Sequence, residues 1–275
     1  MRIIAGPCQH ETLEQSLEIA QECKWVCDQY GFEYIFKASF DKANRTSESG
    51  KRGLGLRPTF CDFIDMKQEI PGLKILTDFH TVEQIRELQH YPNLIDVIQI
   101  PAFLCRQTDL IKEACSTDCV VNIKKGQFLA PWDVHGIMSK TQGAREVWIT
   151  ERGTSFGYNT LVNDFTGMAY LIDQFGDNVV YDITHSVQKP GGQGTSSGGN
   201  RDYVAPLARA GAALGITNFF LEVHKDPDAA PSDGPNMVQL DKFHQVIDGI
   251  DRCRNTVKET TPIDRNYRGF LGPKR

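Results

Sequence analysis

The chain has 275 residues, 40% of them hydrophobic, and a net charge of −5. The mildly negative net charge argues against a general nucleic-acid-binding protein. The sequence contains no run of about 18 consecutive apolar residues, so no membrane-spanning helix is predicted. The first residues lead directly into a short apolar run without a signal-peptide core. We therefore expect a cytoplasmic protein whose eight cysteines are reduced thiols.

Short apolar runs alternate along the chain with stretches of helical periodicity. The runs are Ile3–Ala5, Tyr34–Phe36, Ile75–Leu76, Val97–Ile100, Val120–Ile123, Val147–Ile149, Val179–Ile183 and Phe219–Leu221. The helical stretches are Glu14–Tyr30, Val82–Leu88, Leu110–Ala114, Phe165–Phe175, Val204–Leu214 and Leu240–Ile247. Buried strands that alternate with helices are typical of parallel βαβ units. Eight such strands predict a TIM barrel, an α/β fold whose strand ends form the active site.

An open, doubly wound sheet is the alternative architecture. It normally has a glycine-rich phosphate-binding turn after the first strand, and the turn Gly6–His10 lacks that pattern. Two long connections, Ser39–Gly55 and Ser186–Asn200, are predicted to be binding loops or lids. No change in composition marks a linker, so residues 1–275 are predicted to form one catalytic domain. Its polar tail, Asp251–Arg275, is predicted to be irregular.

Most predicted strands end at or near a charged, thiol or imidazole side chain. These residues are Cys8, Lys37, Asp78, Arg106, Lys124, Arg152, His185 and Glu222. In a closed barrel the eighth strand pairs with the first, so residues after strands one, seven and eight meet at one corner. That corner would contain Cys8, His185, Glu222 and Asp233. Thiolate, imidazole and carboxylate groups suit a divalent transition metal, and Zn, Fe, Co and Mn all remain possible.

Position alone leaves alternatives open at this corner. His10 competes with Cys8, and His224 competes with Glu222, because residues two apart on a strand face the same way. Any of these side chains could instead be packed in the core, and His185 could act as a general base. The metal site is therefore one of several interpretations of the pattern.

Basic residues follow three of the predicted strands, in Lys37–Thr46, Lys124–Gln127 and Glu151–Gly153. Lys and Arg beside hydroxyl and amide donors bind phosphate and carboxylate groups. Three basic loops at one barrel mouth predict a substrate set with more than one anionic group. Alternatively, Lys42 or Lys124 could form a Schiff base with a carbonyl substrate, as in an aldolase that needs no metal.

Longer motifs follow one another in order along the chain. They are Phe36–Arg45, Gln99–Leu110, Asn122–Phe128, Glu151–Asn159, Asp182–Gln188 and Ser232–Pro235. Together they resemble the 3-deoxy-D-manno-octulosonate 8-phosphate synthase family, and the resemblance extends to about residue 250. It implies a TIM barrel, usually a homotetramer, that condenses phosphoenolpyruvate with D-arabinose 5-phosphate and water. The implied products are the eight-carbon sugar acid phosphate, used for lipopolysaccharide, and inorganic phosphate.

The resemblance also implies roles for individual residues. Gly6-Pro7-Cys8 resembles the metal-dependent branch of the family. The implied metal ligands are Cys8, His185, Glu222 and Asp233. The implied catalytic residues are Lys42, His185, Asp233 and Cys8. The implied substrate-binding residues are Ser39, Lys42, Asn44, Arg45, Thr46, Asp78, Phe103, Arg106, Lys124, Gln127 and Arg152. Arg106 would reach the arabinose 5-phosphate of a neighbouring subunit, and Thr46 replaces the family's usual Ser.

Three other functions are compatible with parts of this pattern. Related synthases that use erythrose 4-phosphate or an amino sugar share the barrel and the metal corner, although Lys42–Arg45 resembles the arabinose phosphate branch. A non-catalytic sugar-phosphate-binding barrel would bind ligands without releasing phosphate. A Schiff-base aldolase would be trapped by borohydride. Whether the metal activates water or polarises the aldehyde stays open.

Overall fold

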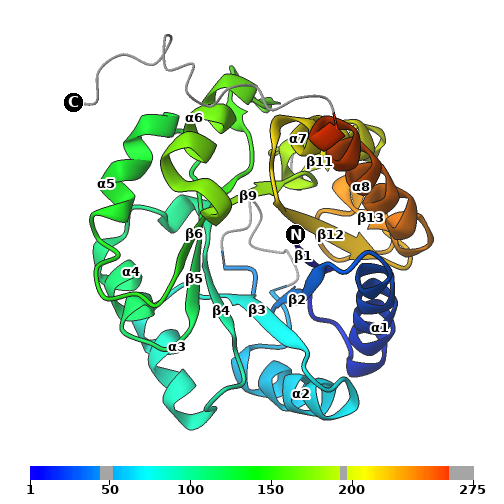
Figure 1. The fold of residues 1–275 in the computed structure, drawn as a ribbon. Helices are drawn as coiled ribbons and strands as arrows, with labels where there is room; N and C mark the ends of the chain where they lie inside the picture. The colour runs from blue at the N-terminus through cyan, green and yellow to red at the C-terminus, as the bar shows by residue number, and fades with distance from the viewer. Residues whose placement is uncertain (44–51, 193–196, 260–275) are drawn as a thin grey trace.

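The computed structural model describes residues 1–43, 52–192 and 197–259, and Figure 1 shows a closed barrel of parallel strands ringed by helices. The barrel strands are β1 (Arg2–Gln9), β2 (Glu33–Ser39), β3 (Lys74–Asp78), β4 (Val97–Ile100), β5 (Val120–Lys124), β6 (Val147–Glu151), β9 (Val179–Asp182) and β12 (Asn218–His224). Pairing of β12 with β1, from Asn218 beside Arg2 to Glu222 beside Gly6, closes the barrel. The predicted TIM barrel is confirmed, and only Ile183 of the predicted runs extends past its strand.

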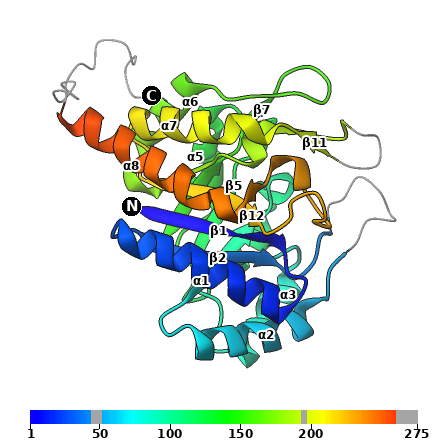
Figure 2. The ribbon, with the colours of Figure 1, turned by 90° about the vertical axis from the view of Figure 1, so that its right-hand side faces the viewer.

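The helices lie outside the strands, and Figure 2 shows α1 and α8 packed side by side along β1. They are α1 (Leu13–Gln29), α2 (Leu56–Glu69), α3 (Val82–Arg86), α4 (Thr108–Cys115), α5 (Val134–Met138), α6 (Phe165–Phe175), α7 (Val204–Leu214) and α8 (Phe243–Glu259). Thr12 starts α1 by accepting a hydrogen bond from the backbone of Gln15. Within the described ranges, no helix is both long enough and apolar enough to cross a bilayer.

The observed helices differ from the predicted ones in three places. Neither α2, which buries Phe60, Phe63 and Met66 against the barrel, nor the short α5 was among the predicted helices. The predicted irregular tail is wrong for residues 251–259, because α8 continues through them to Glu259. This continuation follows from Ile247 and Ile250, whose side chains are buried in the core and anchor the helix. Residues 260–275 lie outside the described part of the chain.

The barrel interior changes from apolar to polar along the strands. Near the strand starts, the inward-facing side chains are Ile4, Ile35, Leu76, Val97, Val120, Trp148, Val180 and Phe220. Two residues further along, where the same face recurs, lie Gly6, Lys37, Asp78, Gln99, Asn122, Thr150, Asp182 and Glu222. The side chains of this second layer are all buried. A separate, larger apolar cluster fills the space between the barrel and its helices.

Candidate active site

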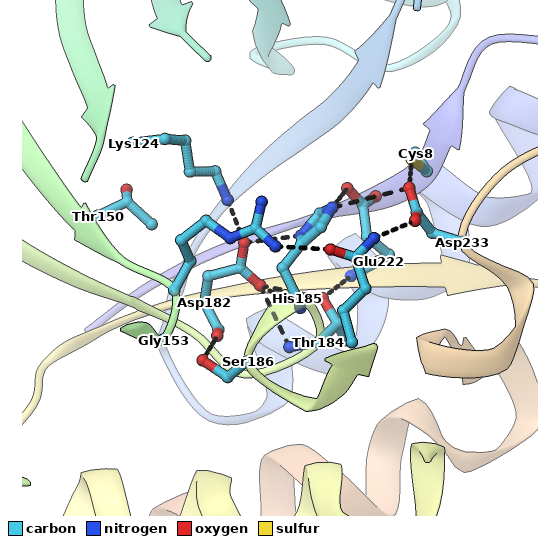
Figure 3. A network of polar contacts seen from close by, with 12 residues as sticks. Cys8, Lys124, Thr150, Gly153, Asp182, Thr184, His185, Ser186, Glu222 and Asp233 are labelled. Atoms are coloured by element: carbon cyan, nitrogen blue, oxygen red, sulfur yellow. Dashed lines mark hydrogen bonds and ion pairs between the residues drawn. The ribbon is translucent and has the colours of Figure 1, made fainter. Parts of the chain in front are cut away.

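Barrel closure brings the ends of β1, β9 and β12 to one corner, which Figure 3 shows from close by. The Sγ atom of Cys8 lies 3.3 Å from Oδ2 of Asp233, and Nε2 of His185 lies 3.8 Å from the same oxygen. One ligand atom from each of these three residues lies within 4.8 Å of the others. Glu222 adjoins the group, with Oε1 3.7 Å from Nε2 of His185. The four predicted metal ligands therefore lie together in the structure. Cys8, His185 and Asp233 form a compact set, and Glu222 lies beside them.

The backbone of β1 is shaped to direct Cys8 into this corner. A Cβ atom on Gly6 would lie 1.9 Å from the carbonyl oxygen of Lys37, so only glycine permits this approach of β1 to β2. The strand register then shifts between Ala5 and Cys8, and Cys8 has a φ of +61°, a region that few non-glycine residues adopt. Burial, together with the carboxylate of Glu222, raises the pKa of the Cys8 thiol to about 12. Without a cation, the thiol is therefore protonated and donates to Asp233.

Asp182, which the sequence analysis did not assign, orients His185. Its Oδ2 bonds to Nδ1 of His185 at 2.7 Å, and its Oδ1 accepts from the His185 backbone N–H at 2.9 Å. Because a carboxylate only accepts, Nδ1 carries a proton, so Nε2 is the nitrogen of this ring that can bind a cation. Burial opposes ionisation of Asp182, but contacts with His185 and Lys124 hold its pKa below the usual range. The sequence does contain a signal for Asp182, because it is a charged residue at the inward-facing end of a buried strand.

Glu222 has one oxygen bound and one free. Its Oε1 accepts from Nζ of Lys37 at 2.8 Å, and the same ammonium donates to the carbonyl of Cys8 at 3.1 Å. Burial disfavours the charge of Lys37, but Glu222 raises the pKa of this lysine above its usual range. The other oxygen, Oε2, is buried without a hydrogen-bond partner, which is costly unless a cation or donor satisfies it. This free acceptor and the thiol, imidazole and carboxylate donors fit a divalent transition metal.

A cavity of about 490 Å³ opens in front of this corner. The predicted site residues that line it are Lys42, Asp78, Phe103, Lys124, Gln127, Arg152, His185 and Asp233. Ser39 lies beside it, with Oγ accepting from Nζ of Lys42 at 2.8 Å. Arg106 does not line this cavity: it is exposed, and its guanidinium lies 5.2 Å from the centre of the Phe128 ring. Asn44, Arg45 and Thr46 lie outside the described residues.

Two buried cations form one wall of the cavity. Lys124 donates to Asp182, and its Nζ lies 3.4 Å from the centre of the Phe220 ring. Burial lowers the pKa of Lys124 and of Arg152, although Asp182 opposes the shift in both. The Nε atom of Arg152 is buried without a partner. Cations with unused donors attract anions, so this wall suits a carboxylate or phosphate group.

Hydrogen bonds run in one direction across the floor of the cavity. Thr150 donates to Asn122 at 2.6 Å, and Asn122 donates to Gln99 at 2.9 Å. Gln99 donates to one oxygen of Asp78, and Ser39 donates to the other. The chain of bonds fixes the Asp78 carboxylate at the cavity wall. A carboxylate held in this way can accept hydrogen bonds from the hydroxyl groups of a sugar.

The fold is an α/β barrel with a polar cavity at its strand ends, and the chain belongs to the DAHP synthetase I family, whose profile matches residues 1–258. It is 50% identical over 250 residues to 2-dehydro-3-deoxyphosphooctonate aldolase of Bartonella bacilliformis (strain ATCC 35685 / KC583 / Herrer 020/F12,63), covering 90% of this chain and 87% of the relative. Proteins with the same name from Chelativorans sp. (strain BNC1) and Rhodopseudomonas palustris (strain TIE-1) are 51% and 48% identical over 252 and 265 residues. These alignments cover 91% and 94% of this chain, and 90% and 91% of the relatives. The resemblance found in the motifs is confirmed.

Proposed function

We propose that this chain condenses phosphoenolpyruvate with D-arabinose 5-phosphate and water. The products are 3-deoxy-D-manno-octulosonate 8-phosphate, for lipopolysaccharide biosynthesis, and inorganic phosphate. The observation that carries the proposal is the cavity that combines the buried Lys124 and Arg152 with the thiol-imidazole-carboxylate corner. The names of the relatives support it, because 2-dehydro-3-deoxyphosphooctonate is the same eight-carbon keto acid phosphate. Residues 1–275 act as one catalytic domain in this proposal.

Each substrate has its own set of contacts in the proposed complex. Phosphoenolpyruvate is held through its carboxylate and phosphate by Ser39, Lys42, Lys124, Gln127 and Arg152. Arabinose 5-phosphate is held by Lys42, Asn44, Arg45, Thr46, Asp78 and Phe103. Arg106 acts on the sugar phosphate in a neighbouring subunit of a homotetramer. Its exposure and its place away from the lining of its own cavity support a role in a second copy.

The reaction needs C3 of the enol phosphate to attack the aldehyde carbon, water to add to C2, and phosphate to leave C2. Lys124 and Arg152 offset the charge repulsion between two anionic substrates and hold them in reacting geometry. Lys42 donates to the aldehyde oxygen as that oxygen gains charge. Asp233 faces the same cavity and accepts a proton from the water, while Nε2 of His185, the ring nitrogen that Asp182 leaves unused, is a metal ligand. A divalent metal held by Cys8, His185, Glu222 and Asp233 would supply Lewis acidity that orients and acidifies this water.

The metal is Zn, Fe, Mn or Co in this proposal, because all four accept mixed sulfur, nitrogen and oxygen ligands. We also propose that the protein acts in the cytoplasm. All eight cysteines are free thiols, which suits a reducing compartment. Cys8 in particular must stay reduced to serve as a ligand.

A phosphate-release assay with both substrates, with and without a chelator, tests the proposal. We expect release to require both substrates, to stop after chelation and to return with added Zn²⁺, Mn²⁺ or Co²⁺. Faster release with erythrose 4-phosphate than with arabinose 5-phosphate would assign the chain to a different synthase. Full activity after complete metal removal would contradict the metal site but leave the condensation intact. Irreversible inactivation by borohydride in the presence of substrate would indicate a Schiff base instead.

A further inference from the structure

Gln188 connects the two halves of the site. It lies in the short strand β10 (Gln188–Lys189), which pairs with β11 (Gly198–Gly199). Its Oε1 accepts from a terminal nitrogen of Arg152 at 2.7 Å, and its Nε2 donates to Oδ1 of Asp233 at 2.6 Å. The amide has only one possible orientation, because a guanidinium only donates and a carboxylate only accepts. One side chain therefore joins the cationic wall to the metal corner.

Because of this bridge, the two carboxylate oxygens of Asp233 have different partners. Oδ1 is occupied by Gln188, while Oδ2 contacts Sγ of Cys8 at 3.3 Å and Oγ of Ser232 at 2.9 Å. The backbone of Asp233 has a φ of +57°, so the residue needs contacts that hold it in a conformation non-glycine residues seldom adopt. With Oδ1 engaged, the carboxylate presents Oδ2 to the cation position. Partners of this kind commonly tune how a ligand binds its metal.

The bridge also sets the orientation of Arg152. One terminal nitrogen is used by Gln188, and Nε is buried without a partner. The plane of the guanidinium is therefore fixed while some of its donors remain for an anion. The hairpin that carries Gln188 is itself fixed to the loop after Asp233. A Cβ atom on Gly199 would lie 1.4 Å from Oδ1 of Asn236, so the backbone of the hairpin lies in direct contact with the Asn236 side chain.

We propose that Gln188 is a positioning residue that couples the binding of phosphoenolpyruvate at Arg152 to the binding of a divalent metal at Asp233. The inference rests on the proposed function. A ligand at one end orders the amide and with it the group at the other end, so the second ligand meets a site that is already ordered. Coupling of this kind is reciprocal. Each ligand therefore strengthens the binding of the other by the same factor.

Calorimetric titration of the full chain with phosphoenolpyruvate, with and without Co²⁺, measures this factor. We expect about fivefold or greater coupling in the wild type. Gln188→Met removes both hydrogen bonds at similar volume and should bring the factor close to one. Competition with a chelator, without substrate, should show Co²⁺ binding about tenfold more weakly to this variant. Lys189→Met, an exposed neighbour on the same hairpin, should match the wild type in both measurements.

A double-mutant cycle shows whether Gln188 acts through Asp233. In an Asp233→Ala background, Gln188→Met should cause no further loss of Co²⁺ affinity. Should the Met variant fail to fold, Gln188→Glu keeps the acceptor for Arg152 and removes the donor to Asp233, and should also lose the coupling. Wild-type coupling in both Gln188 variants, or fully additive losses in the cycle, would overturn the proposal. A wild type that releases no phosphate and binds no phosphoenolpyruvate would instead refute the proposed function.

Discussion

The two ends of this barrel use charged residues in opposite ways. At the N-terminal end, Arg2 pairs with Glu33 at 3.0 Å and lies over the Trp148 ring at 4.0 Å, and Trp148 donates to Glu146. At the C-terminal end, buried polar atoms of Glu222 and Arg152 have no partner.

Each end also has a cavity. The N-terminal one, at about 560 Å³, is the larger, yet oppositely charged side chains paired with one another line it. Cavity size therefore does not identify the site. The site is identified instead by buried polar groups that lack a hydrogen-bond partner. Such groups destabilise the fold unless a ligand satisfies them.

The largest expected effect comes from removing the thiol at the C-terminal end. Cys8→Ala deletes one ligand of the compact set, so we expect loss of bound metal and about a thousandfold or greater fall in phosphate release, about 4 kcal/mol. Metal analysis and the phosphate assay measure the two outcomes. Cys115→Ala, which removes a buried thiol from α4, is the control and should keep both metal and activity. Undiminished turnover in the Cys8 variant would remove the chemical distinction between the two ends.

Shortening a side chain in the apolar layer near the strand starts should lower the stability of the fold and leave the catalytic activity nearly unchanged. Trp148→Ala empties part of the apolar layer and should cost about 3–5 kcal/mol of unfolding free energy. The shift of the urea midpoint measures that loss. Phosphate release per folded molecule should stay within about twofold of the wild type, because the Trp148 ring lies at the opposite end of the barrel from the candidate active site. A fall in turnover that parallels the stability loss would show that the two ends are not separable.

Acidic pH should distinguish a fully buried carboxylate from a partly buried one. Burial opposes ionisation of Asp78, but Lys37 and Lys42 hold its pKa below the usual range. Its carboxylate therefore stabilises the fold above about pH 4, and this contribution is lost as the pH falls further. Glu33 is partly buried, which opposes its ionisation, yet bonds from Lys74 and Arg2 also lower its pKa. Solvent screening makes its contribution smaller.

The measured quantity is the change of the unfolding free energy with pH between about pH 6 and about pH 3. One carboxyl of this kind contributes up to about 1.4 kcal/mol per pH unit to that slope. Asp78→Asn should flatten this slope more than Glu33→Gln. Equal flattening by the two substitutions would mean that burial does not strengthen the linkage at the C-terminal end.

The smallest effect is expected at the outer ion pairs. Arg2→Met removes the contacts with Glu33 and Trp148 but keeps an apolar stem, so we expect a loss below about 1 kcal/mol. The loss should shrink at high salt, which screens exposed charges. Arg2→Lys keeps the charge and removes the planar stacking, and so separates the two contributions. A loss of several kcal/mol in Arg2→Met would show that this end also depends on buried charge.

The sequence by itself determined the barrel and most of its elements. Apolar runs of strand length between stretches of helical spacing leave few folds open, and barrel closure placed Cys8, His185 and Glu222 at one corner. The same pattern did not reveal α2, which follows a long polar connection, or the short α5. It also did not reveal the continuation of α8, whose anchoring side chains are recognised only where they meet the core.

Only the tertiary structure decided which polar side chains pair. Asp182 orients His185, Lys37 occupies one oxygen of Glu222, and Gln188 joins Arg152 to Asp233. The physical reason is that residue spacing fixes the face of a strand on which a side chain lies. Its partner across the barrel depends on the register between strands that are far apart in the sequence.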